Sequence, residues 1–344
     1  MKVIVDTFGG DKAPDSMLQG AFLAMQQDND FEVIFVGDKD VLEQKLSLYS
    51  TPLYMELKKR VEILHASENI DCSESPVTAI KNKPNSSIVL GCEALRKRAD
   101  CGAFVSAGST GAILTGAVLK VGRILGVSRP ALCPMLCTKT GKVMVIDVGA
   151  NMDCKVINLV HFALMGSIYM RALGIPNPRV ALVNVGTEET KGNELTHAVY
   201  EILEKLKDRK KINFVGNMEA RDAFSGDYDV LVCDGFVGNV LLKTTEGTLS
   251  FTMSKVKGAM RGFPGVLGKL ILAPKLLKMK RELSEETVGG SIFLGANKPV
   301  VKAHGNSSAN AFCNAVLVGA RAARLNLGEQ IKEAVAAAGI NEGS

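Results

Sequence analysis

The sequence predicts an α/β protein in which helices cover both faces of a mostly parallel sheet, a three-layer α/β/α architecture. Short apolar runs rich in β-branched residues alternate along the chain with longer segments of helical periodicity, as βα units require. The strand runs are continuously apolar, which indicates burial on both faces. No Pro- or Ser-rich linker divides residues 1–344, so we expect a single unit in which any two lobes are fused around the sheet.

The elements follow from these patterns in order. The run from Lys2 to Thr7 predicts the first strand, the helical spacing of apolar residues from Ser16 to Gln26 predicts a helix, and the run from Glu32 to Gly37 returns to a strand. The same criterion predicts further strands at 61–64, 103–106, 143–148, 180–185, 230–233 and 299–302. Helical patterns occupy 88–98, 110–122, 159–173, 194–208, 240–257 and 308–325.

Composition excludes two classes of protein. With 47% hydrophobic and 22% charged residues, the chain is too apolar to be disordered. Its formal net charge of +5 is too small for a dedicated nucleic-acid-binding protein. A length of 344 residues suffices for a sizeable core. We therefore expect a globular protein with no nucleic-acid partner.

Cysteine usage and the chain start indicate a cytoplasmic protein. The eight cysteines form no C-x-x-C pair and lie mostly in apolar or glycine-rich runs, which is typical of reduced thiols. Asp6 interrupts the first apolar run, so no signal peptide is expected. The longest uncharged stretch, 101–119, is rich in Gly, Ser and Thr and is a poor membrane span.

Charge is concentrated in one segment. Residues 247–281 hold eight basic side chains and no acidic one, so the rest of the chain has a net charge of −3 out of the total of +5. Leucines adjoin these lysines on both sides of Pro274, which predicts two short amphipathic helices within a basic protrusion at 258–285. Such helices bind anionic lipid, although a core helix pair with extended lysines and a docking surface for an acidic protein have similar patterns. The predicted membrane-contact residues are Leu267, Leu270, Ile271, Leu276, Leu277 and Lys278.

Glycine loops follow several of the predicted strands. They occur at Gly9-Gly10, Gly108-Ser109-Thr110-Gly111, Gly149-Ala150-Asn151, Gly186 and Gly235-x-x-Gly238. One such loop is usually a tight turn, but five at strand ends of one sheet predict a composite site for a small anion at main-chain N–H groups. The spacing matches neither a dinucleotide-binding nor a P-loop motif, so NAD and ATP are not expected. We predict no cofactor.

Two polar residues near these loops are candidates for catalysis. Lys191 lies in a polar loop after the strand at 180–185, where it would hold phosphate or stabilise an oxyanion, although the loop also suits a simple helix cap near Asn193. Asn239 can donate through its amide to a carbonyl oxygen, although it too could be only a helix cap. No group of His or carboxylate residues has ligand spacing, so no metal is expected.

Among nucleophiles and proton donors, His304 is the better candidate. It follows the strand at 299–302 beside Gly305 and could face the cleft, as could His65, whereas His161 and His197 fall within helical patterns. No G-x-S-x-G motif is present, which argues against a serine hydrolase. Cys233 ends a buried strand and is expected to be unreactive.

Six segments together resemble the bacterial phosphate acyltransferases of phospholipid synthesis. The most specific is Cys233-Asp234-Gly235-Phe236-Val237-Gly238-Asn239-Val240-Leu241-Leu242-Lys243-Thr244. The others are Asp6 to Pro14, Val105 to Ala112, Asp147 to Asp153, Lys191 to Glu194 and Lys302 to Gly305. The chain departs from the family pattern at Thr7-Phe8, at Ser109 and at Asn306-Ser307-Ser308, where loop detail or substrate preference could differ.

The resemblance implies a reaction, a fold and partners. It implies reversible transfer of a long-chain acyl group from acyl-acyl-carrier-protein to inorganic phosphate, with catalytic roles at Lys191 and Asn239. It implies a fold similar to phosphotransacetylases and isocitrate dehydrogenase-like enzymes, a homodimer, and peripheral contact with the membrane, where a glycerol-3-phosphate acyltransferase would use the product. The expected substrate-binding residues are Gly108, Ser109, Thr110, Gly111, Asn151, Gly235, Gly238 and His304.

The expected mechanism is direct acyl transfer in a ternary complex. Phosphate is partly dianionic at neutral pH, so attack on the thioester needs positioning and charge stabilisation more than a strong base. Two alternatives remain open: a phosphotransacetylase acting on short acyl-coenzyme A, and a non-catalytic membrane scaffold.

Overall fold

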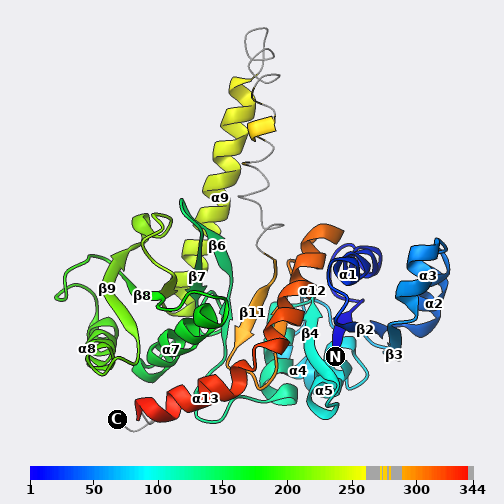
Figure 1. Ribbon diagram of the computed structural model, residues 1–344, viewed down its shortest axis with the longest axis horizontal. Coiled ribbons are helices and arrows are strands. Elements are labelled where there is room, and N and C mark those ends of the chain that lie inside the picture. Colours follow the sequence, from blue (N-terminus) through cyan, green and yellow to red (C-terminus); the bar gives the residue numbers. More distant parts are fainter. Residues whose placement is uncertain (261–271, 273, 277–278, 280–288, 340–344) are drawn as a thin grey trace.

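The computed structural model describes residues 1–260, 272, 274–276, 279 and 289–339, and its strands form two sheets with helices on both faces (Figure 1). The predicted α/β class is confirmed, and most neighbouring strands run parallel. The single sheet expected from the sequence is divided in two. The glycine loops therefore come from two sheet edges that face each other.

The first sheet contains seven strands. They are β1 (Lys2–Asp6), β2 (Glu32–Gly37), β3 (Val61–His65), β4 (Cys101–Ser106), β5 (Ala131–Cys133), β11 (Ser291–Leu294) and β12 (Val300–Lys302), in the order β3-β2-β1-β4-β12-β11-β5. Neighbours from β3 to β12 are parallel, whereas β11 pairs antiparallel with both β12 and β5. The loops after β1, β4 and β12 therefore lie at one edge, the carboxyl edge.

The second sheet contains five strands. They are β6 (Met135–Cys137), β7 (Lys142–Ile146), β8 (Arg179–Asn184), β9 (Asn213–Glu219) and β10 (Val230–Val232), in the order β6-β7-β10-β8-β9. Only β6 runs antiparallel to its neighbour. The loops after β7, β8 and β10 share the carboxyl edge of this sheet, so Lys191 and Asn239 follow adjacent strands.

Helices cover both faces of the sheets. They are α1 (Asp15–Gln27), α2 (Lys39–Ser47), α3 (Pro52–Lys58), α4 (Pro76–Asn82), α5 (Ser87–Lys97), α6 (Thr110–Gly116) with a π-helical turn (Ala117–Val121), α7 (Val156–Ala172), α8 (Glu194–Asp208), a 3₁₀ turn (Ala220–Asp222), α9 (Gly235–Ala259), α12 (Ala309–Arg324) and α13 (Leu327–Ala338). α1 and α12 pack together on one face of the first sheet, and α5 covers the other. α7 contacts the second sheet and also packs against α8 and α13.

Strand burial explains the continuous apolar runs. In β1, Val3 and Val5 belong to the core cluster that contains α1 and α12, whereas Ile4 belongs to the cluster on the opposite face. All three side chains are fully buried. Successive strand residues point to opposite faces, so a strand covered on both sides needs an apolar residue at every position.

Several elements were not predicted from the sequence. The strands β5, β6, β9 and β11 and the helices α2, α3, α4 and α13 are additional, and α9 begins at Gly235 rather than Val240. β5 and β6 have three residues each and are separated only by Pro134, which is too short a pattern to distinguish from a loop. A left-handed Asn326 separates α13 from α12.

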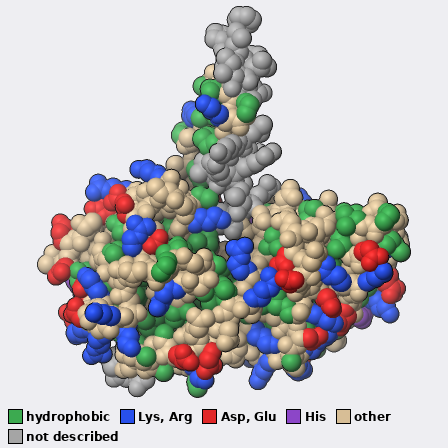
Figure 2. Space-filling model, viewed as in Figure 1, with side chains coloured by type: hydrophobic (Ala, Val, Ile, Leu, Met, Phe, Trp, Pro, Cys, Tyr) green, Lys and Arg blue, Asp and Glu red, His purple; other side chains and the backbone are tan. Residues whose placement is uncertain are grey.

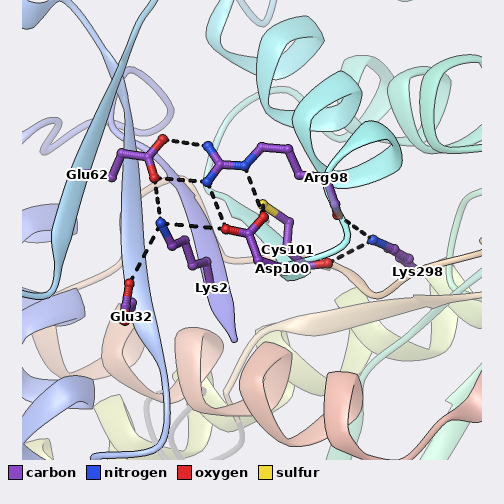
Figure 3. A network of polar contacts seen from close by, with 7 residues as sticks. All are labelled: Lys2, Glu32, Glu62, Arg98, Asp100, Cys101 and Lys298. Carbon is purple, nitrogen blue, oxygen red and sulfur yellow. Dashed lines mark hydrogen bonds and ion pairs between the residues drawn. The ribbon is translucent and has the colours of Figure 1, made fainter.

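An ion-pair network closes the amino-terminal edge of the first sheet (Figure 3). Lys2 Nζ lies 2.7 Å from Glu62 Oε2, and the Arg98 guanidinium contacts both Glu62 and Asp100. Hydrogen bonding to Arg98 lowers the pKa of Glu62 to about 2. Lys298 Nζ donates to the carbonyl oxygens of Arg98 and Cys101 at 2.9 Å each. This network ties β1, β3 and β4 together at the edge opposite the glycine loops.

α9 leaves the body of the protein as a long projecting helix (Figure 1). Only Gly235 and Gly238 of its 25 residues are buried. Hydrophobic and basic side chains occur together on its described outer part (Figure 2), where Phe251 is 63% exposed and Lys255 Nζ lies 5.4 Å from its ring centre. Of the predicted protrusion at 258–285, Leu267, Leu270, Ile271, Leu277 and Lys278 lie outside the described residues; Leu276 is half-buried. No helix in the described part of the chain has the length and apolar character needed to span a bilayer.

Candidate active site

A cavity of about 1640 Å³ lies between the carboxyl edges of the two sheets. The first sheet contributes the Gly108–Gly111 loop and the loop after β12. The second sheet contributes Gly149, Asn239 and the inner side of α9. Six residues predicted to bind substrate or to act in catalysis line this cavity: Gly108, Ser109, Thr110, Gly111, Asn239 and His304.

Asp6 holds the Gly108 loop in place. Its carboxylate accepts a hydrogen bond from Ser106 Oγ at 2.6 Å and others from the main-chain N–H groups of Phe8 and Gly9. Ser106 Oγ in turn accepts from the N–H of Gly108 at 3.0 Å. Burial raises the pKa of Asp6, and the hydrogen bond from Ser106 opposes that shift. This buried contact fixes the loops after β1 and β4 against each other.

Glycine is required where these loops meet. A Cβ at Gly9 would lie 2.5 Å from the main-chain nitrogen of Gly108, closer than real Cβ contacts come. The two loops can therefore touch only because Gly9 has no side chain. The close contact leaves the main chain of Gly108–Gly111 on the cavity wall.

The loop after β12 contains His304, and two lysines lie close to it. His304 is exposed and its Nδ1 accepts from the N–H of Asn306 at 3.5 Å, a long contact. Lys302 Nζ donates to the carbonyl oxygens of Ala107 and Ala303, and Lys12 Nζ donates to that of Asn306. Both lysines line the cavity. Neither lysine was predicted as a site residue, because a lysine in a loop or at a strand end has the same sequence pattern as an ordinary surface residue.

Asp147 organises the edge of the second sheet. This fully buried carboxylate accepts from the N–H groups of Leu132, Ala150 and Asn151 and from the Asn151 side-chain amide, at 2.7–3.2 Å. Burial raises the pKa of Asp147, and these donors oppose the shift. Asn151 also donates to the carbonyl of Pro130 at 2.8 Å, so its amide is occupied inside the protein. Asn151 is not on the cavity wall, and it joins β5 to the end of β7.

Gly235 and Gly238 bring α9 against this edge. The N–H of Gly235 donates to the carbonyl of Asn151 at 2.8 Å, and a Cβ at Gly238 would lie 1.9 Å from the carbonyl oxygen of Asp147. Only glycine permits so close a contact between the helix and the end of β7. Neither glycine lines the cavity; both determine where the first turn of α9 lies.

Asn239 projects into the cavity from that first turn. It lies beside Gly149 and is half-buried. The residue that caps α9 is Asp234, whose carboxylate accepts from the N–H of Val237 at 2.8 Å, so Asn239 is not the helix cap. Within the described part of the chain, the Asn239 amide has no hydrogen-bond partner. An amide left free beside a cavity can donate to a bound oxygen.

Lys191 lies in an exposed loop at the same sheet edge and is not on the cavity wall. Its main-chain carbonyl accepts a hydrogen bond from the Asn184 side chain at 3.0 Å. The Cβ and Cγ atoms of Lys191 pack closely over Gly186, where there is no room for a side chain. The loop ends at Asn193, which caps α8 with a reciprocal bond to Thr196, as one reading of the sequence predicted. β8 and β10 are adjacent, so Lys191 and Asn239 extend from neighbouring loops.

Part of the cavity wall is apolar. β5, β6 and their connection contribute Leu132, Pro134, Met135 and Leu136, and α9 contributes Leu241, Leu242 and Leu249. The three leucines follow Asn239 along the projecting helix, and the same stretch of α9 also contributes polar residues to the lining: Lys243, Thr244, Thr245, Glu246 and Thr248. The cavity therefore combines a polar end at the glycine loops with an apolar wall that is interrupted by polar residues along α9.

Other candidates have structural settings. Burial raises the pKa of the Cys233 thiol far above its usual range, which agrees with the expected lack of reactivity. His161 is buried in α7 and contacts Ser128. In the residues that the structure describes, no three His, Cys, Asp or Glu side chains group as metal ligands.

Comparison with known proteins identifies the family. The model of the family described as "Fatty acid synthesis protein" matches residues 1–330. The chain belongs to this family. It is 45% identical over 320 residues to the phosphate acyltransferase of Clostridium perfringens, covering 92% of this chain and 91% of that protein. It is 42% identical over 339 residues to the phosphate acyltransferase of Brevibacillus brevis, covering 97% of each. The resemblance inferred from sequence motifs is confirmed, and members of the family with this degree of identity are acyltransferases.

Solved structures show the same fold in more distant proteins. A phosphotransacetylase from Streptococcus pyogenes superposes with a TM-score of 0.62 at 17% identity, covering 93% of this chain and 94% of that one. A phosphotransacetylase from Staphylococcus aureus gives 0.60 at 14% identity over the same shares. At these identities the likeness establishes the fold, and the predicted similarity to phosphotransacetylases is confirmed at that level.

Proposed function

We propose that this family member transfers a long-chain fatty acyl group from acyl-acyl-carrier-protein to inorganic phosphate, reversibly, giving acyl phosphate for phospholipid synthesis. The observation that supports this most directly is the cavity, in which the Asn239 amide lies between a polar end and an apolar wall and has no hydrogen-bond partner among the described residues. The 45% identical relative is named for phosphate acyl transfer, which is the same chemistry.

In the proposed reaction a phosphate oxygen attacks the thioester carbonyl carbon. A C–O bond forms, the C–S bond breaks, and the carrier leaves as a thiolate that takes up a proton. Asn239 donates to the carbonyl oxygen as it gains charge. Lys191 is exposed in the neighbouring loop and outside the cavity wall, so its proposed role in stabilising the same charge requires its side chain to reach into the cavity when substrate is bound. Phosphate is already partly dianionic at neutral pH, so catalysis depends on positioning the two substrates.

The acyl chain is proposed to lie on the apolar wall. Leu241, Leu242 and Leu249 line the cavity from one helix, at positions that extend away from Asn239. Burying methylene groups there stabilises a long acyl chain by about 0.8 kcal/mol for each CH₂ removed from water. An acetyl group would leave this wall unused, so the cavity favours a long-chain donor over a phosphotransacetylase reaction with short acyl-coenzyme A.

The experiment that tests this function is phosphate-dependent thiol release. Purified protein is mixed with palmitoyl-acyl-carrier-protein, and free thiol is followed with and without phosphate. We expect release only with phosphate, and at least about 10-fold faster than with acetyl-coenzyme A because of the apolar wall. Faster reaction of acetyl-coenzyme A would favour the phosphotransacetylase, and no release from either donor would favour the scaffold.

The basic projection is proposed to bring the enzyme to the membrane or to its carrier. Residues 247–281 have eight basic side chains and no acidic one, and described apolar residues such as Phe251 and Leu272 are exposed. Acyl phosphate is a reactive mixed anhydride, so release near a glycerol-3-phosphate acyltransferase at the membrane would limit its hydrolysis.

A homodimer is proposed as well, with exposed apolar residues at the start of α9 and in the β8 loop available for contact: Val185, Phe236, Val237 and Val240.

Replacing two leucines of the projection should remove membrane binding. We expect Leu272→Ser with Leu276→Ser to abolish sedimentation with phosphatidylglycerol vesicles, since the remaining lysines give only weak, salt-sensitive attraction. Thiol release in solution should stay at the parental rate. The control is Leu48→Ser with Leu53→Ser, two exposed leucines near α2 and α3 on the body. Sedimentation of the projection variant at the parental level would contradict the proposal.

A further inference from the structure

Lys302 occupies an unusual position for a lysine. It is the last residue of β12, in register with Ser106 of β4, and it lines the cavity beside the Gly108 loop. Its Nζ lies 3.2 Å from the carbonyl oxygen of Ala107 and 2.5 Å from that of Ala303. A lysine ammonium has three N–H donors, so these two bonds leave one for a ligand.

The charge of Lys302 is not balanced by an ion pair. In the described part of the chain, no carboxylate lies within 4 Å of its Nζ. Two cations contributed to the lining by the second sheet are paired: Lys243 lies 2.7 Å from Glu246, and Arg221 lies 3.0 Å from Glu219. Lys12 resembles Lys302, since its one hydrogen bond is to the Asn306 carbonyl at 3.1 Å. Among the described residues, Lys302 and Lys12 therefore line one end of the cavity without a carboxylate partner.

Hydrogen bonds from side chains and the main chain fix the loops around these lysines. The Gly108 loop is held by Asp6 through Ser106, and the N–H of Asp11 donates to the Gly305 carbonyl at 2.8 Å. The loops after β1, β4 and β12 are thus bonded to one another before any ligand arrives. A site with fixed donors and an unpaired cation binds a small anion without first reorganising.

We propose that Lys302, assisted by Lys12, holds the phosphate substrate at the first sheet, across the cavity from Asn239. This inference rests on the proposed function and assigns its two substrates to opposite edges. The attacking phosphate lies on the glycine-loop side, and the thioester carbonyl lies on the α9 side. Lys302 is then a phosphate-binding residue, and Lys191 and Asn239 act on the acyl group.

Lysine suits this task because, besides its two carbonyl contacts, it keeps a third N–H on a side chain that lines the cavity. Burial lowers the pKa of Lys302 to about 8, and the nearby Cys72, Asp6 and Asp11 oppose that shift. Lys12 and His304 also face this end of the cavity. A bound phosphate dianion favours the charged ammonium, so substrate and proton bind together.

The test compares Lys302→Met with Lys298→Met. Lys298 has the same arrangement at the opposite edge of the sheet, where its Nζ donates to two main-chain carbonyls (Figure 3). Each variant loses two hydrogen bonds to main-chain carbonyls. A fall in melting temperature that both variants share therefore measures what these bonds contribute to the stability of the fold. With palmitoyl-acyl-carrier-protein as donor, we expect Lys302→Met to raise the KM for inorganic phosphate by about 10- to 100-fold, the loss of one charge-assisted hydrogen bond. The KM for the acyl donor should change less than about 2-fold, and Lys298→Met should keep the parental KM for phosphate.

A second variant at the same position tests whether the positive charge of Lys302, rather than the integrity of the fold, is needed for phosphate binding. Lys302→Arg keeps the positive charge and should restore phosphate binding at least partly. In the parent, kcat/KM for phosphate should fall as pH rises through about 8, because the free enzyme loses the Lys302 proton there. In Lys302→Arg that fall should be absent, since guanidinium stays protonated.

The outcomes distinguish the two proposals. If the parent protein releases no thiol in response to phosphate, the proposed function fails. If the parent reacts but Lys302→Met keeps its KM for phosphate, or changes only the KM for the acyl donor, the assignment of phosphate to Lys302 is wrong. An equal rise in the KM for phosphate in Lys298→Met would also overturn it, because the effect would then come from loss of the fold.

Discussion

Asn239→Ala is expected to lower the rate of phosphate-dependent thiol release by about 100- to 1000-fold, the usual effect of removing one oxyanion donor. Its amide lies on the cavity wall without a hydrogen-bond partner in the described part of the chain, and Asp234 already caps the helix. The stability of the fold should therefore change by less than about 0.5 kcal/mol. Single-turnover rates at saturating phosphate measure the effect on the chemical step.

The isosteric variant Asn239→Asp sharpens this prediction. It keeps the size of the side chain and replaces the donor by a carboxylate, which would repel both the oxyanion and phosphate. We expect a loss at least as large as that of alanine. The control is Asn213→Ala, which removes a surface amide bonded to the Asn177 carbonyl and should keep the parental rate. Parental turnover in both Asn239 variants would remove this residue from the mechanism.

Asp147→Ala is expected to lower the free energy of unfolding by about 3 kcal/mol or more. The carboxylate satisfies three main-chain N–H groups and the Asn151 amide, and its side chain is fully buried. Each buried donor left without an acceptor costs about 1–3 kcal/mol. β5, the Asn151 loop and the start of α9 depend on this residue, so turnover should fall as well. Urea unfolding monitored by circular dichroism gives the change in midpoint.

The matched control is Asp153→Ala, six residues along the same chain segment. Asp153 is exposed, and it contributes a main-chain carbonyl to Arg129. Removal of its carboxyl group should change the free energy of unfolding by less than about 0.5 kcal/mol. A loss below about 1 kcal/mol in Asp147→Ala would mean that water or a relaxed loop satisfies the donors, and that the edge of the second sheet does not depend on Asp147.

Local patterns were sufficient for the main strands and for the glycine loops. Val3, Ile4 and Val5 are apolar without alternation, and the other main strands share this pattern, so burial on both faces and a mostly parallel sheet could be predicted. Gly108–Gly111 and Asn239 were recognised because they follow strand ends, and the structure places them on one cavity. The short strands β5 and β6 were not recognised, because three-residue runs carry too little periodicity.

The sequence by itself determined the fold class, the family and the residue types at the strand ends, because these depend on neighbours in the chain. Only the tertiary structure decided that the strands divide into two sheets. It also decided which polar groups have partners: among the described residues, Lys302 and Lys12 lack a carboxylate partner. Within the same residues, the Asn151 amide is bonded inside the protein and the Asn239 amide has no hydrogen-bond partner. The reason is physical: whether a polar group is free depends on groups far away in sequence. Lys302 and its partner Ala107 are 195 residues apart, and Asp147 and the α9 glycine that contacts it are on separate βα units.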